Sequence, residues 1–293
     1  MGLNKYTWIG FSSILIWASL VAVVKLITES VTPISGVAMI YSFSALSILL
    51  FGGIPSIREM PKAYIYGCGI LFIAYEILFL ISIALSHNHQ QVLVIAMINY
   101  LWPPITILFA ILAKQLNFNR IFFVGLILAI IGLLMVVNPE ILDFEKFLIV
   151  LSENPKAYSF AFLGAILWSC YSVLTKKYAE GFNAVPIFFL ITAISLWMLH
   201  FALNEAFIMP SLNLWLAIAV SGGLIGLAYS NWNQSLQFGN IQLLILATYF
   251  MPILSSLMSM LILGVMPSFA FWIGTGLVTI GALICWKYTY PYK

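Results

Sequence analysis

The sequence predicts an all-α membrane protein in which ten transmembrane helices form two inverted five-helix repeats around a central cavity. Composition is the first of three observations that predict it, because only 7% of the 293 residues are charged and 63% are hydrophobic. Soluble domains carry roughly 25% charged residues, so no water-soluble fold explains this balance. The other two observations are a series of long apolar stretches and a pattern of residues that both halves of the chain repeat.

Ten apolar stretches are long enough to cross a hydrocarbon core of ~30 Å, at about 1.5 Å per helical residue. In chain order they cover about residues 7–28, 33–53, 64–85, 90–113, 121–138, 158–178, 184–203, 212–236, 240–264 and 268–286. The connections between them are short, with one exception. Residues 139–157 alternate charged with apolar side chains, which predicts an amphipathic linker on the membrane surface.

Seven residues of the first half recur in the second half at a nearly constant offset. Trp17, Lys25, Glu29, Tyr100, Pro103, Gly125 and Gly132 match Trp168, Lys176, Glu180, Tyr249, Pro252, Gly274 and Gly281. The offset is 151 residues for the first three pairs and 149 for the others, as one small loop insertion would give. Because five spans reverse the direction of the chain, the second copy must lie upside down relative to the first. The predicted units are residues 1–138, a linker of residues 139–157 and residues 158–293.

The positions of the basic residues predict the orientation in the membrane. With the N-terminus placed inside, nine Lys and Arg residues fall on inner loops and three on outer ones. Inner loops carry the excess of basic residues in membrane proteins, so both termini are expected in the cytoplasm and the linker outside. No loop clusters the basic residues that a phosphate backbone needs, so we expect no nucleic acid partner.

Three tryptophans, Trp17, Trp102 and Trp168, lie near the middle of their spans, although Trp prefers the two membrane interfaces. Indoles at this depth indicate a polar or ligand-filled interior. The alternative is that they fill core space and donate to a neighbouring carbonyl. Asn99 shares a helical face with Trp102, and so does Tyr171 with Trp168. Such faces are turned toward protein or water rather than lipid.

The only acid near the centre of a span is Glu76, and an unpaired carboxylate there is costly. Two interpretations stay open. Glu76 couples proton movement to its function, or it is a neutral carboxyl that bonds Asn99 or a backbone carbonyl. Pro103 and Pro252 interrupt repeat-equivalent spans, which predicts a kink and a potential hinge in each half.

Two lysines, Lys25 and Lys176, lie toward the ends of their spans, one turn before Glu29 and Glu180. We expect both to extend their amines to the membrane surface and to pair with these acids, with a role in gating or carboxylate binding as the alternative. The three cysteines stand alone inside apolar spans, without the spacing of a disulfide or a metal site. The sequence therefore predicts no metal and no cofactor.

Several strings of this chain resemble one known family. They are Tyr75-Glu76, Asn99-Tyr100-Leu101-Trp102-Pro103, Lys177-Tyr178-Ala179, Gly181-Phe182-Asn183, and Tyr229 with Trp232-Asn233. The sequence resembles the YddG-type amino acid exporters of the drug/metabolite transporter superfamily, whose halves are EamA-type repeats. This resemblance runs from the first span to the last and implies export of amino acids, notably aromatic ones, across the bacterial inner membrane. One departure is His87-Asn88-His89, which replaces a different His-containing stretch.

On this resemblance we expect alternating-access export of aromatic and other neutral amino acids by a monomer or weak homodimer in the bilayer. The expected lining of the cavity consists of Trp17, Tyr75, Asn99, Trp102, Trp168, Tyr171, Tyr229 and Asn233. Efflux of aromatic or quaternary cations is an alternative, because aromatic walls also suit such ligands. A membrane-embedded enzyme is a further alternative, but His87, His89 and His200 offer neither zinc-ligand spacing nor a nucleophile beside a base.

Overall fold

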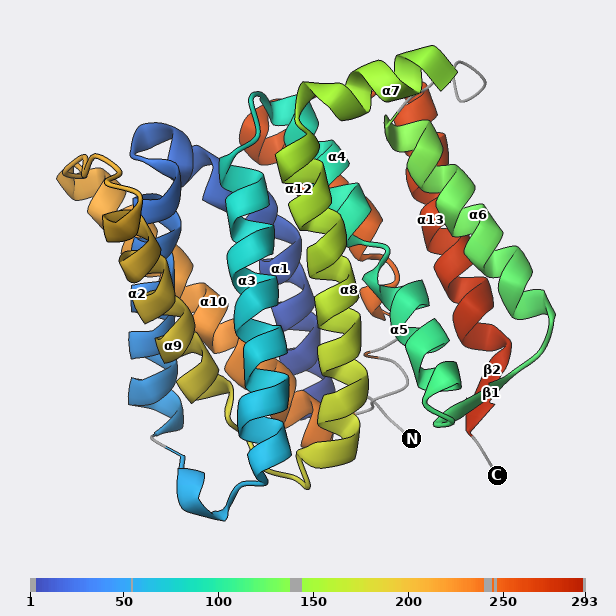
Figure 1. Cartoon of the computed structure of the whole chain (residues 1–293), viewed down its shortest axis with the longest axis horizontal. Helices are drawn as coiled ribbons and strands as arrows, with labels where there is room; N and C mark the ends of the chain where they lie inside the picture. The colour runs from blue at the N-terminus through green and yellow to red at the C-terminus, as the bar shows by residue number, and fades with distance from the viewer. Residues whose placement is uncertain (1–3, 54, 138–143, 240–243, 245–246, 292–293) are drawn as a thin grey trace.

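The computed structural model describes residues 4–53, 55–137, 144–239, 244 and 247–291, and it is almost entirely helical (Figure 1). The helices are α1 Lys5–Ser30, α2 Pro33–Gly52, η1 Ile57–Glu59, η2 Ala63–Cys68, α3 Gly69–Ala84, α4 His89–Asn99, α5 Trp102–Leu112, α6 Ile121–Val137, α7 Phe144–Glu153, α8 Pro155–Tyr178, α9 Val185–Ala202, α10 Leu212–Phe238, α12 Met251–Leu263 and α13 Phe269–Lys287. Two short strands, β1 Leu116–Phe118 and β2 Thr289–Pro291, pair antiparallel. This small sheet links the α5–α6 connection to the segment after α13, and no sequence pattern predicted it.

Eight helices or helix runs in the described part of the chain are long and apolar enough to cross a membrane. They are α1, α2, η2 with α3, α4 with α5, α8, α9, α10 and α13. The helices α6 and α12 are apolar but shorter, and both lie within the fifth and ninth apolar stretches. Part of the ninth stretch, residues 240–243 and 245–246, lies outside the described residues. The prediction of a multi-pass helical membrane protein is therefore confirmed.

Helix ends in an apolar bundle need side-chain caps, because the first backbone N–H groups have no partner inside the helix. Asn88 accepts from the Gln91 N–H at 2.9 Å and begins α4, while Asn154 accepts from the Ala157 N–H at 3.2 Å and begins α8. At the other end of a helix, Gly264 adopts φ 65° and terminates α12. The helix α7 lies across one end of the bundle, within the predicted linker (Figure 1).

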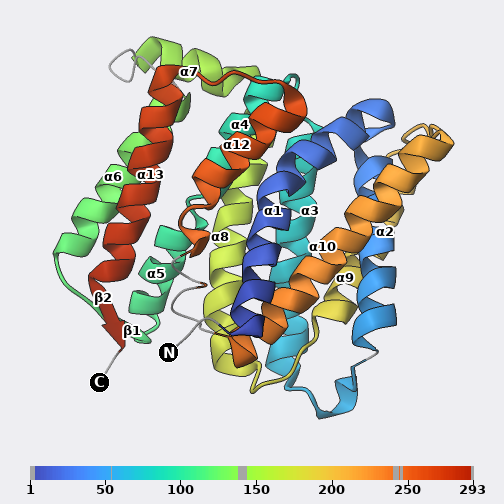
Figure 2. The same ribbon diagram turned by 180° about the vertical axis from the view of Figure 1, so that it is seen from behind.

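The main contacts between a helix of the first half and a helix of the second half have counterparts between the repeat-equivalent helices. Helix α1 packs on α10 and α12, and its repeat partner α8 packs on α3, α4 and α5 (Figure 2). Two further pairs, α2 with α9 and α6 with α13, each join equivalent helices of the two halves. Each half thus makes the same kind of contact with the other half.

Glycines bring α6 and α13 into direct backbone contact. A Cβ on Gly132 would lie 2.5 Å from the Gly274 carbonyl oxygen, and a Cβ on Gly274 would lie 2.5 Å from the Gly132 carbonyl oxygen. Gly125 and Gly281 meet in the same way, at 2.7 and 2.5 Å. Exchanging repeat-equivalent residues turns one glycine pair into the other, so the two helices pack antiparallel with a local twofold relation.

We expect Gly274→Ala to destabilise the protein, because no space exists for a Cβ between α13 and α6. Overpacking of this kind costs about 1–3 kcal/mol. Gly276→Ala is the matched control on the same helix, since nothing lies within 4 Å of a Cβ there. The melting temperature in detergent should fall for Gly274→Ala and stay at or above the parent value for Gly276→Ala. Equal melting of both variants would contradict this packing.

Both halves break a helix just before a proline. Between α4 and α5, the Leu101 N–H bonds the Ile98 carbonyl at 3.2 Å, and before α12 the Phe250 N–H bonds the Ala247 carbonyl at 3.1 Å. These are tighter i−3 bonds at repeat-equivalent positions, and Pro103 and Pro252 lie in the first turn of the helices that follow. The predicted interruptions are present, and movement about them remains a prediction.

A carboxylate from the second half caps the start of α2. Glu205 accepts from the Ile34 and Ser35 N–H groups, both at 2.9 Å, and His200 Nδ1 lies 2.8 Å from it. Burial alone would raise the pKa of Glu205, but these hydrogen bonds outweigh it and hold the pKa below its ordinary value. The α9–α10 connection is thereby fixed to the first half.

Glu205→Ala should lower the free energy of unfolding by about 1–2 kcal/mol, because two helix N–H groups lose their acceptor. A lowered pKa stabilises the folded state at neutral pH, and this contribution disappears as the pH falls through the lowered value. Melting temperatures of parent and variant should therefore differ at neutral pH and converge in acid. A difference that stays constant down to acid would show that the carboxylate charge contributes nothing.

Candidate functional site

Aromatic rings gather around Trp168 of α8 in the interior of the bundle. Its ring centroid lies 4.7 Å from that of Tyr75 on α3 and 5.1 Å from that of Tyr171, one turn along α8. Trp102, at the start of α5, meets it edge-on at 6.3 Å. The Ser169 hydroxyl donates to the Trp102 carbonyl at 3.0 Å and so holds the helix break against α8.

A second group of rings surrounds Trp17 of α1. Tyr229 and Trp232, both on α10, lie 5.0 and 5.1 Å from it. Phe72 of α3 connects the two groups, since its ring lies 6.1 Å from Trp168 and 6.0 Å from Tyr229. Phe72 could not be recognised from the sequence, because a phenylalanine in an apolar span carries no polar signal. Phe72 precedes Tyr75 by three residues, and this spacing alone indicated that the two side chains share one face of α3.

Two buried N–H donors in this region have no hydrogen-bond partner among the described residues. They are the indole Nε1 of Trp17 and the amide Nδ2 of Asn99. A Cβ on Gly164 would lie 3.7 Å from Asn99 Nδ2 and 3.5 Å from Tyr75 Cδ2, which places the amide beside the first ring group. An unsatisfied buried donor costs about 1–3 kcal/mol, so both point to a polar partner that binds there.

Glu76 lies next to the aromatic cluster and is only 1% exposed. Its carboxylate accepts from the Tyr229 hydroxyl at 2.7 Å and from the Tyr41 hydroxyl. Tyr41 of α2 stacks on Phe189 of α9 at 5.1 Å. The partners are thus two tyrosines, where the sequence suggested Asn99 or a backbone carbonyl. Tyr41 went unnoticed because a lone tyrosine in an apolar span resembles ordinary core.

The structure brings seven of the eight expected lining residues into this one region. They are Trp17, Tyr75, Asn99, Trp102, Trp168, Tyr171 and Tyr229. The side chain of Asn233 lies outside the described part of the chain. Within that part, no group of three His, Cys, Asp or Glu residues is placed to hold a metal ion.

The chain also matches known proteins along nearly its whole length. The sequence profile of the EamA-like transporter family matches residues 155–286. The aromatic amino acid exporter YddG of Escherichia coli (strain K12) is 35% identical over 287 residues, which cover 98% of each chain. The chain belongs to the YddG family of EamA-like transporters. The YddG of Salmonella typhimurium (strain 14028s) is also 35% identical over 98% of both chains, and that of Ancylobacter novellus is 26% identical over 97% of this chain and 98% of its own.

A solved crystal structure has the same fold as this YddG-family chain. The two superpose with a TM-score of 0.68 and are 24% identical, over 97% of this chain and 98% of the other. The family assignment and the apolar helices together make this protein a multi-pass membrane transporter.

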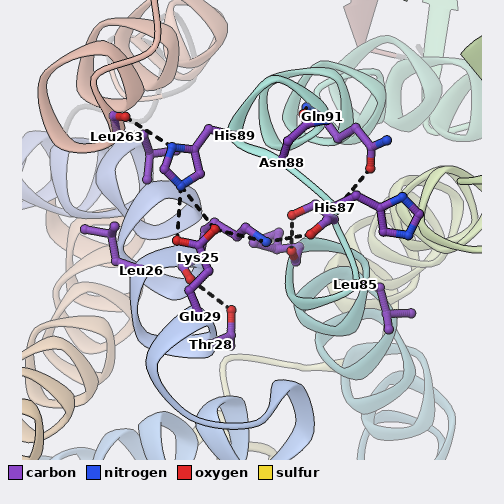
Figure 3. A network of polar contacts seen from close by, with 12 residues as sticks. Lys25, Leu26, Thr28, Glu29, Leu85, His87, Asn88, His89, Gln91 and Leu263 are labelled. Carbon is purple, nitrogen blue, oxygen red and sulfur yellow. Dashed lines mark hydrogen bonds and ion pairs between the residues drawn. The ribbon is translucent and has the colours of Figure 1, made fainter. Parts of the chain in front are cut away.

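The prediction for Lys25 in this YddG-family chain is wrong. Lys25 does not extend to the surface but is 4% exposed, and its Nζ donates to the Ser86 carbonyl at 2.5 Å (Figure 3). The cause is the α3–α4 connection, which lies over the end of α1. The expected ion pair with Glu29 is present at 3.4 Å.

Proposed function

We propose that this protein exports aromatic and other neutral amino acids from the bacterial cytoplasm across the inner membrane by alternating access. One observation carries the proposal. An aromatic cluster built from α1, α3, α5, α8 and α10 encloses buried N–H donors without partners, in a chain that is 35% identical to two aromatic amino acid exporters. Aromatic walls and unpaired polar groups are the two things that a zwitterion with an aromatic side chain requires.

The geometry suggests how the two parts of the substrate are bound. The rings of Trp17, Trp168 and their neighbours would enclose the substrate side chain by stacking and edge contacts. The N–H groups of Trp17 and Asn99 would donate to its carboxylate, since both are donors that lack an acceptor. The ammonium would be accepted by amide and carbonyl oxygens near the helix break before Pro103.

We further propose that ten transmembrane helices form two inverted five-helix repeats, residues 1–138 and 158–293, joined by an outer linker of residues 139–157. The exchangeable helix pairs, the crossed glycine pairs and the equivalent helix breaks support this arrangement. So does the EamA-like profile, which matches residues 155–286 alone as one unit. The basic residues favour cytoplasmic termini. We expect the transporter to act as a monomer or weak homodimer, without cofactor, catalysis or nucleic acid.

The orientation predicts how introduced cysteines react. Ser152 on α7 and Lys287 at the end of α13 are both exposed, so either position is accessible to a reagent on its own side. In intact cells, a membrane-impermeant maleimide should label Ser152→Cys and leave Lys287→Cys unlabelled, and permeabilisation should expose both. Labelling of Lys287→Cys from outside would contradict the inverted repeat.

A second candidate function is the efflux of aromatic quaternary cations. It is favoured by the buried carboxylate of Glu76 beside Tyr229, since a cation would gain from both a negative charge and an aromatic wall.

Cells that lack their own aromatic exporters can test both candidates. Such cells are fed a phenylalanine dipeptide, which they hydrolyse, and the phenylalanine that appears in the medium is measured with and without this protein. We expect faster appearance of phenylalanine with the protein and unchanged retention of a preloaded aromatic quaternary ammonium ion. The reverse pattern would assign the protein to cation efflux.

A further inference from the structure

A network of charged and polar groups closes the end of the bundle where α7 lies. Its centre is Glu29, near the end of α1, whose carboxylate is 3.4 Å from Lys25 Nζ and 3.1 Å from His89 Nε2 (Figure 3). Lys25 also donates to the Ser86 carbonyl in the α3–α4 connection. Two helix ends and the connection that leads into α4 are therefore held by one carboxylate and one buried amine.

The second ring nitrogen of His89 extends the network to α12. His89 Nδ1 lies 3.2 Å from the Leu263 carbonyl oxygen, at the last residue of α12. Both partners of this ring, a carboxylate and a carbonyl, are acceptors. Whichever ring nitrogen carries a hydrogen donates it to the acceptor that it faces. Glu29 therefore lies between the ammonium group of Lys25 and the ring of His89.

Neighbouring amides fix the α3–α4 connection from the other side. Asn154, the cap of α8, donates to the Leu85 carbonyl at 2.9 Å and to Gln91 Oε1 at 3.0 Å. Gln91 also accepts from the His87 N–H at 3.0 Å. Two cavities, of about 520 and 380 Å³, flank this region and share Asn88, Gln90 and Met266 in their walls. The network therefore lies directly beside open space at this end of the bundle.

The repeat-equivalent residues at the opposite end are in a different state. Lys176 and Glu180 match Lys25 and Glu29 in sequence, yet both are exposed, and no ion pair joins them among the described residues. In an inverted repeat, a difference between equivalent groups means that the two ends of the molecule are in different conformations. The end near α7 is the one where ion pairs and hydrogen bonds hold the helix ends together.

We propose that Lys25, Glu29 and His89 form an ionic latch that holds the ends of α1 and α12 and the start of α4 together and so closes the outer end of the transport path. This inference rests on the proposed function, because it names the groups that close one side of an alternating-access exporter. Opening then requires Glu29 to release His89, so that α12 can move away from α1. The Glu29 carboxylate is 39% exposed, so solvent screens its pairs and the latch is weak enough to open during each cycle.

Distances between spin labels test the latch directly. Labels are placed on cysteines at Ser30, His87 and Met266, all exposed, in a full-length chain in lipid nanodiscs whose three native cysteines are replaced by alanine. The pairs Ser30–Met266 and Ser30–His87 report on α12 and on the α3–α4 connection. The parent should show mainly one short distance for each pair.

Glu29→Gln and His89→Gln should each raise the population at longer distance, in at least one pair, by about threefold or more. Glu180→Gln is the matched control, since it removes the same charge at the repeat-equivalent position and should leave both distances as in the parent. The melting temperature of each variant confirms that it is folded. Parent-like distances in both Glu29→Gln and His89→Gln would overturn the latch.

The outcome is separable from that of the export assay. The distance measurement needs no substrate, so a protein that fails to export phenylalanine still reports whether the latch exists. Conversely, unchanged distances in the two variants would remove the latch and leave the proposed function intact.

Discussion

Trp168→Ala is expected to lower the export of an aromatic amino acid about thirtyfold, which corresponds to about 2 kcal/mol of lost binding. Trp168 contacts the rings of Tyr75, Tyr171, Trp102 and Phe72, so its removal takes away the centre of the ring group on α8. The measurement is the initial rate of phenylalanine efflux from cells at several internal concentrations, normalised to the amount of folded protein in the membrane.

Trp8→Ala is the matched control for this variant. Trp8 is also an indole in a membrane helix, but it is 59% exposed on α1, and its ring contact is with Phe11 rather than with the rings around Trp168. It should export at the parent rate. If Trp168→Ala also exports at the parent rate while folded, then the indole fills core space and binds no substrate.

Glu76→Gln is expected to abolish the response of export to an imposed pH gradient, while exchange down a substrate gradient continues. Glu76 is the only acid near the middle of a span, and its carboxylate accepts from two tyrosine hydroxyls. Glutamine keeps the shape of the side chain but cannot take up or release a proton. The measurement compares flux in proteoliposomes with and without an inward proton gradient.

Tyr41→Phe distinguishes the ability of Glu76 to titrate from the hydrogen bonds that its carboxylate accepts. It removes one donor to Glu76 and leaves the carboxyl group able to titrate. It should slow export and retain the response to the gradient. A Glu76→Gln variant that matches the parent at every gradient would make Glu76 a structural group that joins α2, α3 and α10, and the protein a facilitator driven by substrate concentration.

The fold could be predicted to a large extent because the bilayer imposes simple rules on a sequence. The lengths of the apolar stretches predicted the positions of the helices, and Pro103 and Pro252 predicted the interruptions that precede them. The glycines of α6 and α13 were recognised as repeat-equivalent residues, although their crossed pairing between the two halves required coordinates. The β1–β2 pair escaped because three-residue strands in loops carry no periodic signal.

Site residues with polar atoms could be predicted from the sequence, whereas residues that belong to the site only through their packing partners could not. Trp168 and Asn99 stood out because polar atoms at membrane depth need a reason. Phe72 did not, since every span is rich in apolar rings. The partners of Glu76 and the burial of Lys25 also depend on which helix or connection lies opposite, and a local pattern contains no such information. In the sequence, His89 stood out as a departure from the family pattern, but its two acceptors, Glu29 and Leu263, lie on two other segments that the local sequence does not identify.

The central claim is that the aromatic cluster carries amino acids across the membrane, and efflux from proteoliposomes tests it most directly. Purified protein is reconstituted into liposomes loaded with labelled phenylalanine, and the release of label is followed with unlabelled phenylalanine, tryptophan, lysine or glutamate outside. We predict release that depends on the protein, is accelerated by external phenylalanine and tryptophan through exchange, and is unaffected by lysine and glutamate. Release no faster than from protein-free liposomes, or acceleration by all four amino acids alike, would contradict the account.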